Sequence, residues 1–146
     1  MNIEVCTVVR VTDEIAEAVA RLVPQLSPAL QEPPIERLRA IAACDRTALF
    51  VARAAGVPVG MLTLAWYDAP SGRKAWVEDV AVDAAARGRG IGVALVRAAL
   101  EHAARIGAER VALTSNPART AARALYRKMG FEEAGTTLFV RKIDKE

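Results

Sequence analysis

A glycine-rich loop that leads directly into an alanine-rich helix constrains this chain more than any other feature. Residues 85–100 read AARGRGIGVALVRAAL and place Gly88, Gly90 and Gly92 around the start of the expected helix. Because glycine lacks a Cβ and takes positive φ angles freely, such a loop lets several backbone N–H groups approach one anion. The helix N-terminus adds unpaired N–H groups and the positive end of its dipole. The pattern indicates either a phosphate or pyrophosphate site or a tight turn with close packing.

Two familiar phosphate loops do not fit the spacing of these glycines. A P-loop requires Gly-Lys followed by Ser or Thr, which is absent here. The dinucleotide fingerprint G-x-G-x-x-G, counted from Gly88, requires a glycine where Val93 stands. Arg87 and Arg89 add charge-assisted contacts for an anion, so the loop predicts an anion site of another kind.

Length and composition predict one globular domain over residues 1–146. The chain is 53% hydrophobic and 25% charged, and none of its apolar runs approaches the roughly 18 residues that cross a bilayer. The N-terminus lacks the features of a signal peptide, so we expect a cytoplasmic protein with no membrane partner. The net charge is +3, but the arginines are spread along the chain, which argues against a nucleic-acid partner. Cys6 and Cys44 lack metal-type spacing, so we expect reduced core cysteines and no metal site.

Hydrophobic periodicity, together with the positions of proline and glycine, predicts an α/β fold. The expected strands are residues 3–11, 47–53, 57–67, 74–82 and 109–114, with one or two more within 131–143. The first expected helix is capped by Thr12 or Asp13 and runs to residue 23, where Pro24 ends it. The other expected helices are residues 35–42, 90–106 and 117–129. Ala55-Gly56 predicts a hairpin between the second and third strands. This order, β-αα-βββ-α-β-α-β, predicts a mixed β-sheet sandwiched by helices.

Two stretches, VEDVAVDAAARGRGIGVALVRAAL and NPARTAARALYRKMGF, together resemble the GCN5-related N-acetyltransferase (GNAT) family. The resemblance is close over residues 77–131, and the element order extends it over nearly the whole chain. In that family an R/Q-x-x-G-x-G/A signature binds the pyrophosphate of acetyl-coenzyme A (acetyl-CoA). The residues that match the signature are Arg87, Gly88, Arg89, Gly90, Ile91 and Gly92.

The resemblance implies the acyl-CoA N-acyltransferase fold and further contacts to the cofactor. It implies that the strand ending Val80, Ala81 and Val82 offers its backbone to the pantetheine arm and the thioester carbonyl. The strand at residues 109–114 splays away from it, which leaves a gap where cofactor and amine meet. The resemblance also implies that Asn116 and the helix after it hold the far side of the cofactor. Arg119, Arg123 and Arg127 form a stripe typical of a solvated ion-pair face, and the alternative is that Arg119 or Arg123 reaches the 3′-phosphate of the cofactor.

Glu78 is the candidate general base. A primary amine has a pKa of about 10.4, so a base or a water chain must accept its proton before acetyl transfer. Strand alternation places Glu78 on the same face as Trp76, Val80 and Val82, with Asp79 opposite. Asp79 is the second candidate for the base, and an ordinary salt bridge in the strand is the structural alternative for Glu78.

Tyr126 is the candidate general acid for the departing coenzyme A thiolate, a role that the family resemblance favours. It lies on the margin of the apolar stripe of the helix 117–129, where an aromatic ring packs and its hydroxyl reaches a cleft. The alternative is a tyrosine that only packs at the edge of the core. Asn116 and Pro117 have the sequence pattern of a helix cap and first helical residue whatever the function.

The sequence does not identify the acceptor, which is a small-molecule amine or a protein amine. Trp66, Tyr67 and Trp76 either line its pocket or pack the sheet. His102 lies late in a helix, away from the loop, and is interpreted as structural. We expect direct attack of the amine in a ternary complex, and the resemblance favours a homodimer. The alternative is a catalytically inactive module that binds acyl-CoA as a sensor or subunit.

Overall fold

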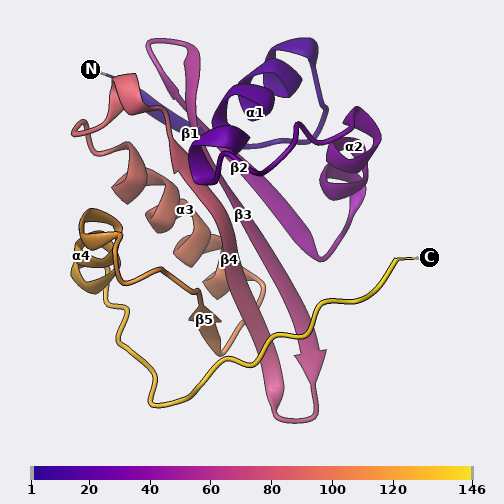
Figure 1. Cartoon of the computed structure of the whole chain (residues 1–146), viewed down its shortest axis with the longest axis vertical. Coiled ribbons are helices and arrows are strands. Elements are labelled where there is room, and N and C mark those ends of the chain that lie inside the picture. The colour runs from indigo at the N-terminus through magenta and orange to yellow at the C-terminus, as the bar shows by residue number, and fades with distance from the viewer. Residues whose placement is uncertain (1, 146) are drawn as a thin grey trace.

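Within residues 2–145, which the computed structural model describes, five strands form one sheet (Figure 1). Their order across the sheet follows the sequence: β1 (Ile3–Thr7), β2 (Thr47–Ala54), β3 (Val57–Ala69), β4 (Gly72–Val82) and β5 (Arg110–Ala112). Neighbouring strands are antiparallel except β4 and β5, which are parallel. The predicted mixed sheet is therefore confirmed.

Helices cover both faces of this sheet. On one face lie α1 (Asp13–Leu26) and α2 (Ile35–Ala43), and on the other lies α3 (Ile91–Arg105), with α4 (Thr120–Lys128) beside it (Figure 1). Successive side chains of β2 point to opposite faces of the sheet, so Leu49 packs with α1 and α2 while Phe50 packs with α3. A short 3-10 turn, η1 (Ala84–Ala86), precedes the glycine loop. The predicted sandwich is confirmed.

Local signals set most of the element boundaries. The Thr12 hydroxyl caps α1 by accepting a hydrogen bond of 3.2 Å from the Ile15 N–H. The predicted end of this helix at Pro24 is wrong, because α1 continues to Leu26. A proline in the last turn removes only one late backbone hydrogen bond, and the Gln25 side-chain amide donates to the Arg21 carbonyl at 3.4 Å.

The β2–β3 hairpin turns at Ala55 and Gly56, as predicted. Their φ angles are 50° and 80°, and two positive values in succession are the requirement of a type I′ turn. This turn matches the right-handed twist of the two strands and sets the first two pairs of the hairpin, Ala54 with Val57 and Arg53 with Pro58, after which the register shifts by one residue.

A β-bulge interrupts β4 at Asp79, whose φ is 52°. Thr63 of β3 pairs with Glu78, but Met61 pairs with Ala81, so β4 has one residue more than β3 across this interval. The extra residue reverses which face each later side chain occupies.

The bulge changes the faces on which the site residues of β4 lie. Val77 packs against α3, and so do Val80 and Val82 beyond the bulge. Glu78 therefore shares the opposite face with Trp76, and the prediction that it shares a face with Val80 and Val82 is wrong. Simple alternation gave the wrong face because it assumes an uninterrupted strand.

The predicted strands within residues 131–143 are also wrong, because the structure describes none between residues 131 and 145. The observed order ends at α4, without the final β of the predicted order. The segment instead runs past the lower ends of β4 and β3 in Figure 1. Its large apolar side chains stay exposed, since no strand pairs with it in the described part of the chain. They are Leu138, Phe139, Val140 and Ile143.

Candidate active site

The glycine loop forms an open backbone surface at the start of α3. Gly88 and Gly90 have φ angles of 80° and 81°, and Gly90 occupies the N-cap position of α3 without any side-chain cap hydrogen bond. A Cβ added to either glycine would meet no atom within 4 Å, so the approach to the backbone is free. The uncapped N–H groups and the dipole of a 15-residue helix suit the pyrophosphate of a coenzyme A molecule.

Two other glycines set the position of α3. A Cβ at Gly92 would lie 3.0 Å from Leu125 Cδ2, so Gly92 allows α4 to approach the first turn of α3. A Cβ at Gly60 in β3 would lie 3.0 Å from Ile91 Cγ2, so Gly60 allows that turn to rest on the sheet. Sequence reasoning missed Gly60, although a glycine inside a strand often marks a close approach.

β4 and β5 part soon after they meet. Their pairing extends only from Lys74 with Arg110 to Trp76 with Ala112, while β4 continues to Val82. Within residues 2–145, the far half of β4 therefore has no strand partner on its β5 side, as the predicted splay requires. This unpaired half leads directly to the glycine loop and contains Val80, Ala81 and Val82, the residues predicted to contact the cofactor.

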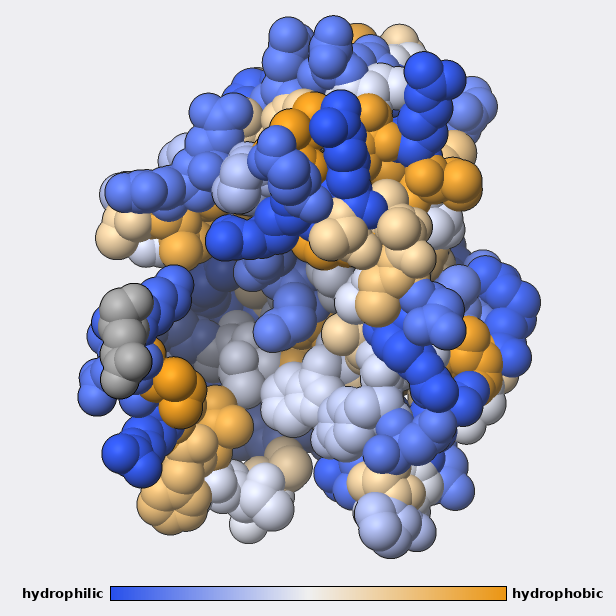
Figure 2. All heavy atoms as spheres, turned by 90° about the vertical axis from the view of Figure 1, so that its right-hand side faces the viewer, coloured by the Kyte–Doolittle hydropathy of each residue, from blue (hydrophilic) through white to orange (hydrophobic). Residues whose placement is uncertain are grey.

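A cavity of about 620 Å³ lies beside this gap. Trp76 contributes to its wall from β4, and Arg123, Tyr126 and Arg127 contribute from α4. The remaining wall comes from β5, the residues after it and the segment after α4. Figure 2 shows a deep hollow on one side of the molecule, with hydrophobic side chains on its rim. Four hydroxyl side chains also line the cavity: Thr114, Ser115, Thr136 and Thr137.

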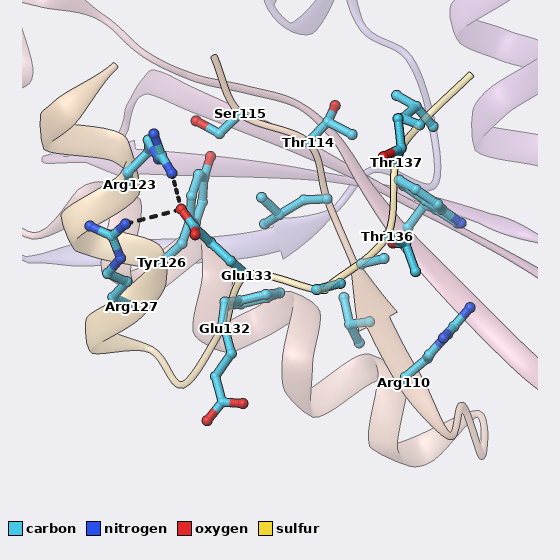
Figure 3. Close-up of a pocket in the computed structure, with 17 residues that line it drawn as sticks. Arg110, Thr114, Ser115, Arg123, Tyr126, Arg127, Glu132, Glu133, Thr136 and Thr137 are labelled. Atoms are coloured by element: carbon cyan, nitrogen blue, oxygen red, sulfur yellow. Dashed lines mark hydrogen bonds and ion pairs between the residues drawn. The ribbon is translucent and has the colours of Figure 1, made fainter. Parts of the chain in front are cut away.

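Tyr126 is partly buried and faces the cavity. Its ring lies 5.9 Å from that of Phe131 in an edge-on contact, and its hydroxyl points toward Ser115 (Figure 3). Burial raises the pKa of the Tyr126 phenol, and the positive charge of Arg119 opposes this effect. The hydroxyl is therefore protonated at neutral pH, as a proton donor must be.

Glu78 lies two residues beyond Trp76 on the same face of β4, but it does not line the cavity. Partial burial raises the pKa of its carboxyl, and the negative charge of Asp79 raises it further. A carboxylate with a raised pKa is a stronger base than an ordinary one. Glu78 therefore lies near the cavity in a state that favours proton acceptance.

Residues 15–131 match the Acetyltransferase (GNAT) family. The chain belongs to this family. A relative from Oryza sativa subsp. japonica, named probable glucosamine 6-phosphate N-acetyltransferase 2, is 45% identical over 69 residues, which are 47% of this chain and 40% of that protein. The chain thus matches less than half the length of this curated relative.

Solved structures share the fold over nearly the whole chain. A putative acetyltransferase from Agrobacterium tumefaciens str. C58 is 25% identical with a TM-score of 0.82, covering 95% of this chain and 99% of that one. AAC(6')-Iy in complex with the bisubstrate analog CoA-S-monomethyl-acetylneamine is 24% identical with a TM-score of 0.79, covering 99% and 100%. The predicted acyl-CoA N-acyltransferase fold is therefore confirmed for this GNAT chain.

The GNAT site residues predicted from the sequence divide into two groups in space. The cavity wall includes Tyr126 and Arg123, but not the glycine loop, Asn116 or Arg119. The Asn116 side-chain oxygen accepts a hydrogen bond of 2.9 Å from the Ala118 N–H and caps a turn. The prediction that Pro117 begins the helix is wrong, because α4 begins at Thr120 after this separate turn.

Sequence reasoning missed an ion-pair cluster in the cavity wall of this GNAT chain. Arg123 and Arg127 on α4 both donate to one carboxylate oxygen of Glu133, the latter at 3.3 Å (Figure 3). A contact of Arg123 with the cofactor stays a prediction, and it requires that the ion pair between Arg123 and Glu133 first breaks. The spacing of Arg123 and Arg127 signals a shared helix face, but no local signal links that face to Glu133.

The aromatic residues have separate roles. Trp66 is buried in the core, Tyr67 is 46% exposed, and Trp76 lines the cavity. His102 lies between rings, with centroid distances of 5.6 Å to Phe50 and 5.3 Å to Trp66. Burial lowers the pKa of His102, and the positive charge of Arg105 lowers it further. These contacts give His102 a packing role, as the sequence interpretation holds.

Cys6 and Cys44 are free but exposed, so their predicted place in the core is wrong. Among residues 2–145, no group of three or more His, Cys, Asp or Glu side chains has an arrangement suited to a metal ion. The helices in the described part of the chain are too short or too polar to span a bilayer.

Proposed function

We propose that this chain is an acetyl-CoA-dependent N-acetyltransferase that transfers the acetyl group directly to a primary amine in a ternary complex. The observation that carries the proposal is the unpaired end of β4, which leads into an uncapped glycine turn at the start of α3. Membership of the GNAT family supports the same cofactor. The competing function is a module that binds acyl-CoA without turnover.

Backbone groups hold the cofactor in this proposal. The loop from Arg87 to Gly92 binds the pyrophosphate, and the backbone of Val80, Ala81 and Val82 binds the pantetheine arm and the thioester carbonyl. Asn116 and Arg119 lie on the far side of the cofactor. Arg119 or Arg123 binds the 3′-phosphate, and Arg119 lies outside the ion-pair cluster that Arg123 forms with Glu133.

Glu78 and Tyr126 move the protons. The amine nitrogen forms a bond to the carbonyl carbon of the thioester, and the bond from that carbon to sulfur breaks. Glu78 accepts the proton that the amine loses, directly or through water, and its raised pKa suits this role. Tyr126 donates its hydroxyl proton to the departing sulfur.

The acceptor binds in the cavity beside Tyr126. We include amino sugars among the acceptors because the rice relative is named for glucosamine 6-phosphate and because Trp76 and hydroxyl side chains line the cavity. Protein amines are the alternative acceptor. A homodimer stays a prediction that the resemblance alone supports.

A thermal-shift experiment followed by turnover tests the function. A ligand at 100 times its dissociation constant stabilises the folded state by about 2.7 kcal/mol, and this corresponds to a rise in Tm of about 8 °C for a chain of this length. We expect such a rise with acetyl-CoA and release of free thiol with at least one amine of a panel. A missing shift contradicts the cofactor site, while a shift without turnover supports the inactive module.

A further inference from the structure

The wall of the cavity carries more positive than negative charge. Arg110, Arg123 and Arg127 contribute three guanidinium groups, and the acidic residues in the wall are Glu132 and Glu133. Glu132 points away from the cavity, whereas the Glu133 carboxylate points toward Arg123 and Arg127 (Figure 3). The inward charge therefore favours an anion over a polycation.

Arg123 and Arg127 form a converging pair. They lie one helical turn apart on α4, and both donate to the same oxygen of Glu133. The Arg123 side chain is 25% exposed, whereas those of Arg127 and Glu133 are 61% and 69% exposed, so the cluster lies at the open edge of the cavity, where a ligand has access to it. The Glu133 carboxylate stands in chemically for an anionic oxygen of a ligand, because guanidinium groups bind carboxylates and phosphates through the same geometry.

The remaining wall suits a hydroxylated molecule. The indole of Trp76 provides an aromatic surface, and the side chains of Thr114, Ser115, Thr136 and Thr137 provide donors and acceptors. An anion held in place of the Glu133 carboxylate would keep the rest of the ligand beside the Tyr126 ring. The two arginines that bind the anion, the hydroxyl groups and the proton donor therefore line the same cavity.

We propose that the acceptor is a hydroxylated amine that carries a phosphate or carboxylate group, and that Arg123 and Arg127 bind this anionic group. Glu133 occupies the pair until the acceptor replaces it. The inference rests on the proposed function, since it places the acceptor in the cavity beside Tyr126. It predicts discrimination against polycationic amines.

Binding is tested first, without any need for turnover. Glucose 6-phosphate has the hydroxyl groups and the anion but no amine, so its protection in a thermal-shift titration reports the anion site alone. We expect Arg127→Gln to weaken its binding about tenfold or more, the loss typical of a charge-assisted contact, and Glu133→Gln to strengthen it several-fold. Arg97→Gln, a surface change of the same charge on α3, is the matched control and should bind like the parent. Equal binding by the parent and Arg127→Gln, or no binding at all, overturns the proposal.

Turnover then distinguishes the source of the anion. The kcat/KM values for glucosamine, glucosamine 6-phosphate, glucosaminic acid and spermidine are compared with thiol release as the readout. We expect a phosphate or carboxylate to raise kcat/KM at least tenfold over glucosamine, chiefly through KM, and Arg127→Gln to remove this advantage. A preference for spermidine or for uncharged glucosamine overturns the anion site and leaves the proposed acetyltransferase intact. Failure of the proposed function gives a different result: no amine of the series is acetylated, although glucose 6-phosphate still binds through Arg127.

Arg123 needs its own comparison because the sequence also assigns it to the cofactor. We expect Arg123→Gln to bind coenzyme A and dephospho-coenzyme A as the parent does, and to lose affinity for glucose 6-phosphate. A variant that loses affinity for coenzyme A but not for dephospho-coenzyme A instead places Arg123 at the 3′-phosphate, which overturns its part in the acceptor site.

Discussion

Gly60→Ala should weaken both the fold and the cofactor site by adding one methyl group. The new Cβ would lie 3.0 Å from Ile91 Cγ2, 3.1 Å from Leu95 Cδ1 and 3.2 Å from the Ala81 carbonyl oxygen. Ile91 and Leu95 are 1% and 0% exposed, and the third atom is backbone, so the neighbours have little room to move. Overpacking of this kind costs about 1–3 kcal/mol, which lowers Tm by about 3–9 °C for a chain of this length.

The same substitution should reduce coenzyme A affinity, because Ile91 is the first residue of α3 and the methyl group pushes that turn away from the sheet. Thermal unfolding followed by circular dichroism measures the first effect, and calorimetric titration with coenzyme A measures the second. Gly135→Ala is the matched control, since a Cβ there meets no atom within 4 Å and the glycine has no positive φ. A Gly60→Ala protein with the Tm and affinity of the control would refute the reasoning.

Four further predictions concern the site and its support. Gly90→Val and Gly107→Val place the same side chain at φ angles of 81° and 75°, so both should lose stability, but only Gly90→Val should lose coenzyme A affinity in a titration. Tyr126→Phe should lower kcat by about 10²-fold with little change in cofactor affinity, and full activity would assign the acid role to water. The deficit of Glu78→Gln should shrink in a pH–rate series as rising pH neutralises the amine, whereas a constant deficit would remove Glu78 as the base. Because the pKa of His102 is lowered in the folded state, the unfolded state binds more protons as the pH falls. The contribution of His102 to the free energy of unfolding is therefore full above a pH of about 6.5 and decreases as the pH drops toward the folded pKa. The midpoint of urea unfolding should depend less on pH in His102→Gln than in the parent.

Local sequence signals predicted the parts of the fold that depend on single residues. Gly88 and Gly90 adopt the positive φ angles that their spacing indicated, and Ala55-Gly56 forms the expected turn. Thr12 caps its helix as its position before the first apolar residues suggests. Each of these features depends on the conformation of one or two residues, which sequence alone constrains strongly.

Features that depend on pairing between distant segments were not predicted. The bulge at Asp79 is a mismatch of register with β3, and nothing within β4 indicates it. The segment 131–143 has strand-forming residues, but a strand also needs a partner, and none pairs with it in the described structure. The site residues also divide into those that local sequence predicts and those that depend on contacts between distant segments. Tyr126 follows from helical periodicity, whereas the meeting of Arg127 with Glu133 does not.

The bulge gives β4 one residue that the two layers of the core do not need. Deleting Asp79 would leave a regular ladder from Glu78 to Ala81, because the bulge is the one residue by which β4 exceeds β3. Val80 and Val82 would still face α3, and Ala81 would still face the other layer of the core. A substitution at Asp79 changes the cost of one left-handed φ, which glycine and asparagine also tolerate, and removes the negative charge beside Glu78. An alignment across this strand should therefore admit both varied residues and a one-residue gap at position 79, and a gap placed there would mark a relative whose strand has no bulge.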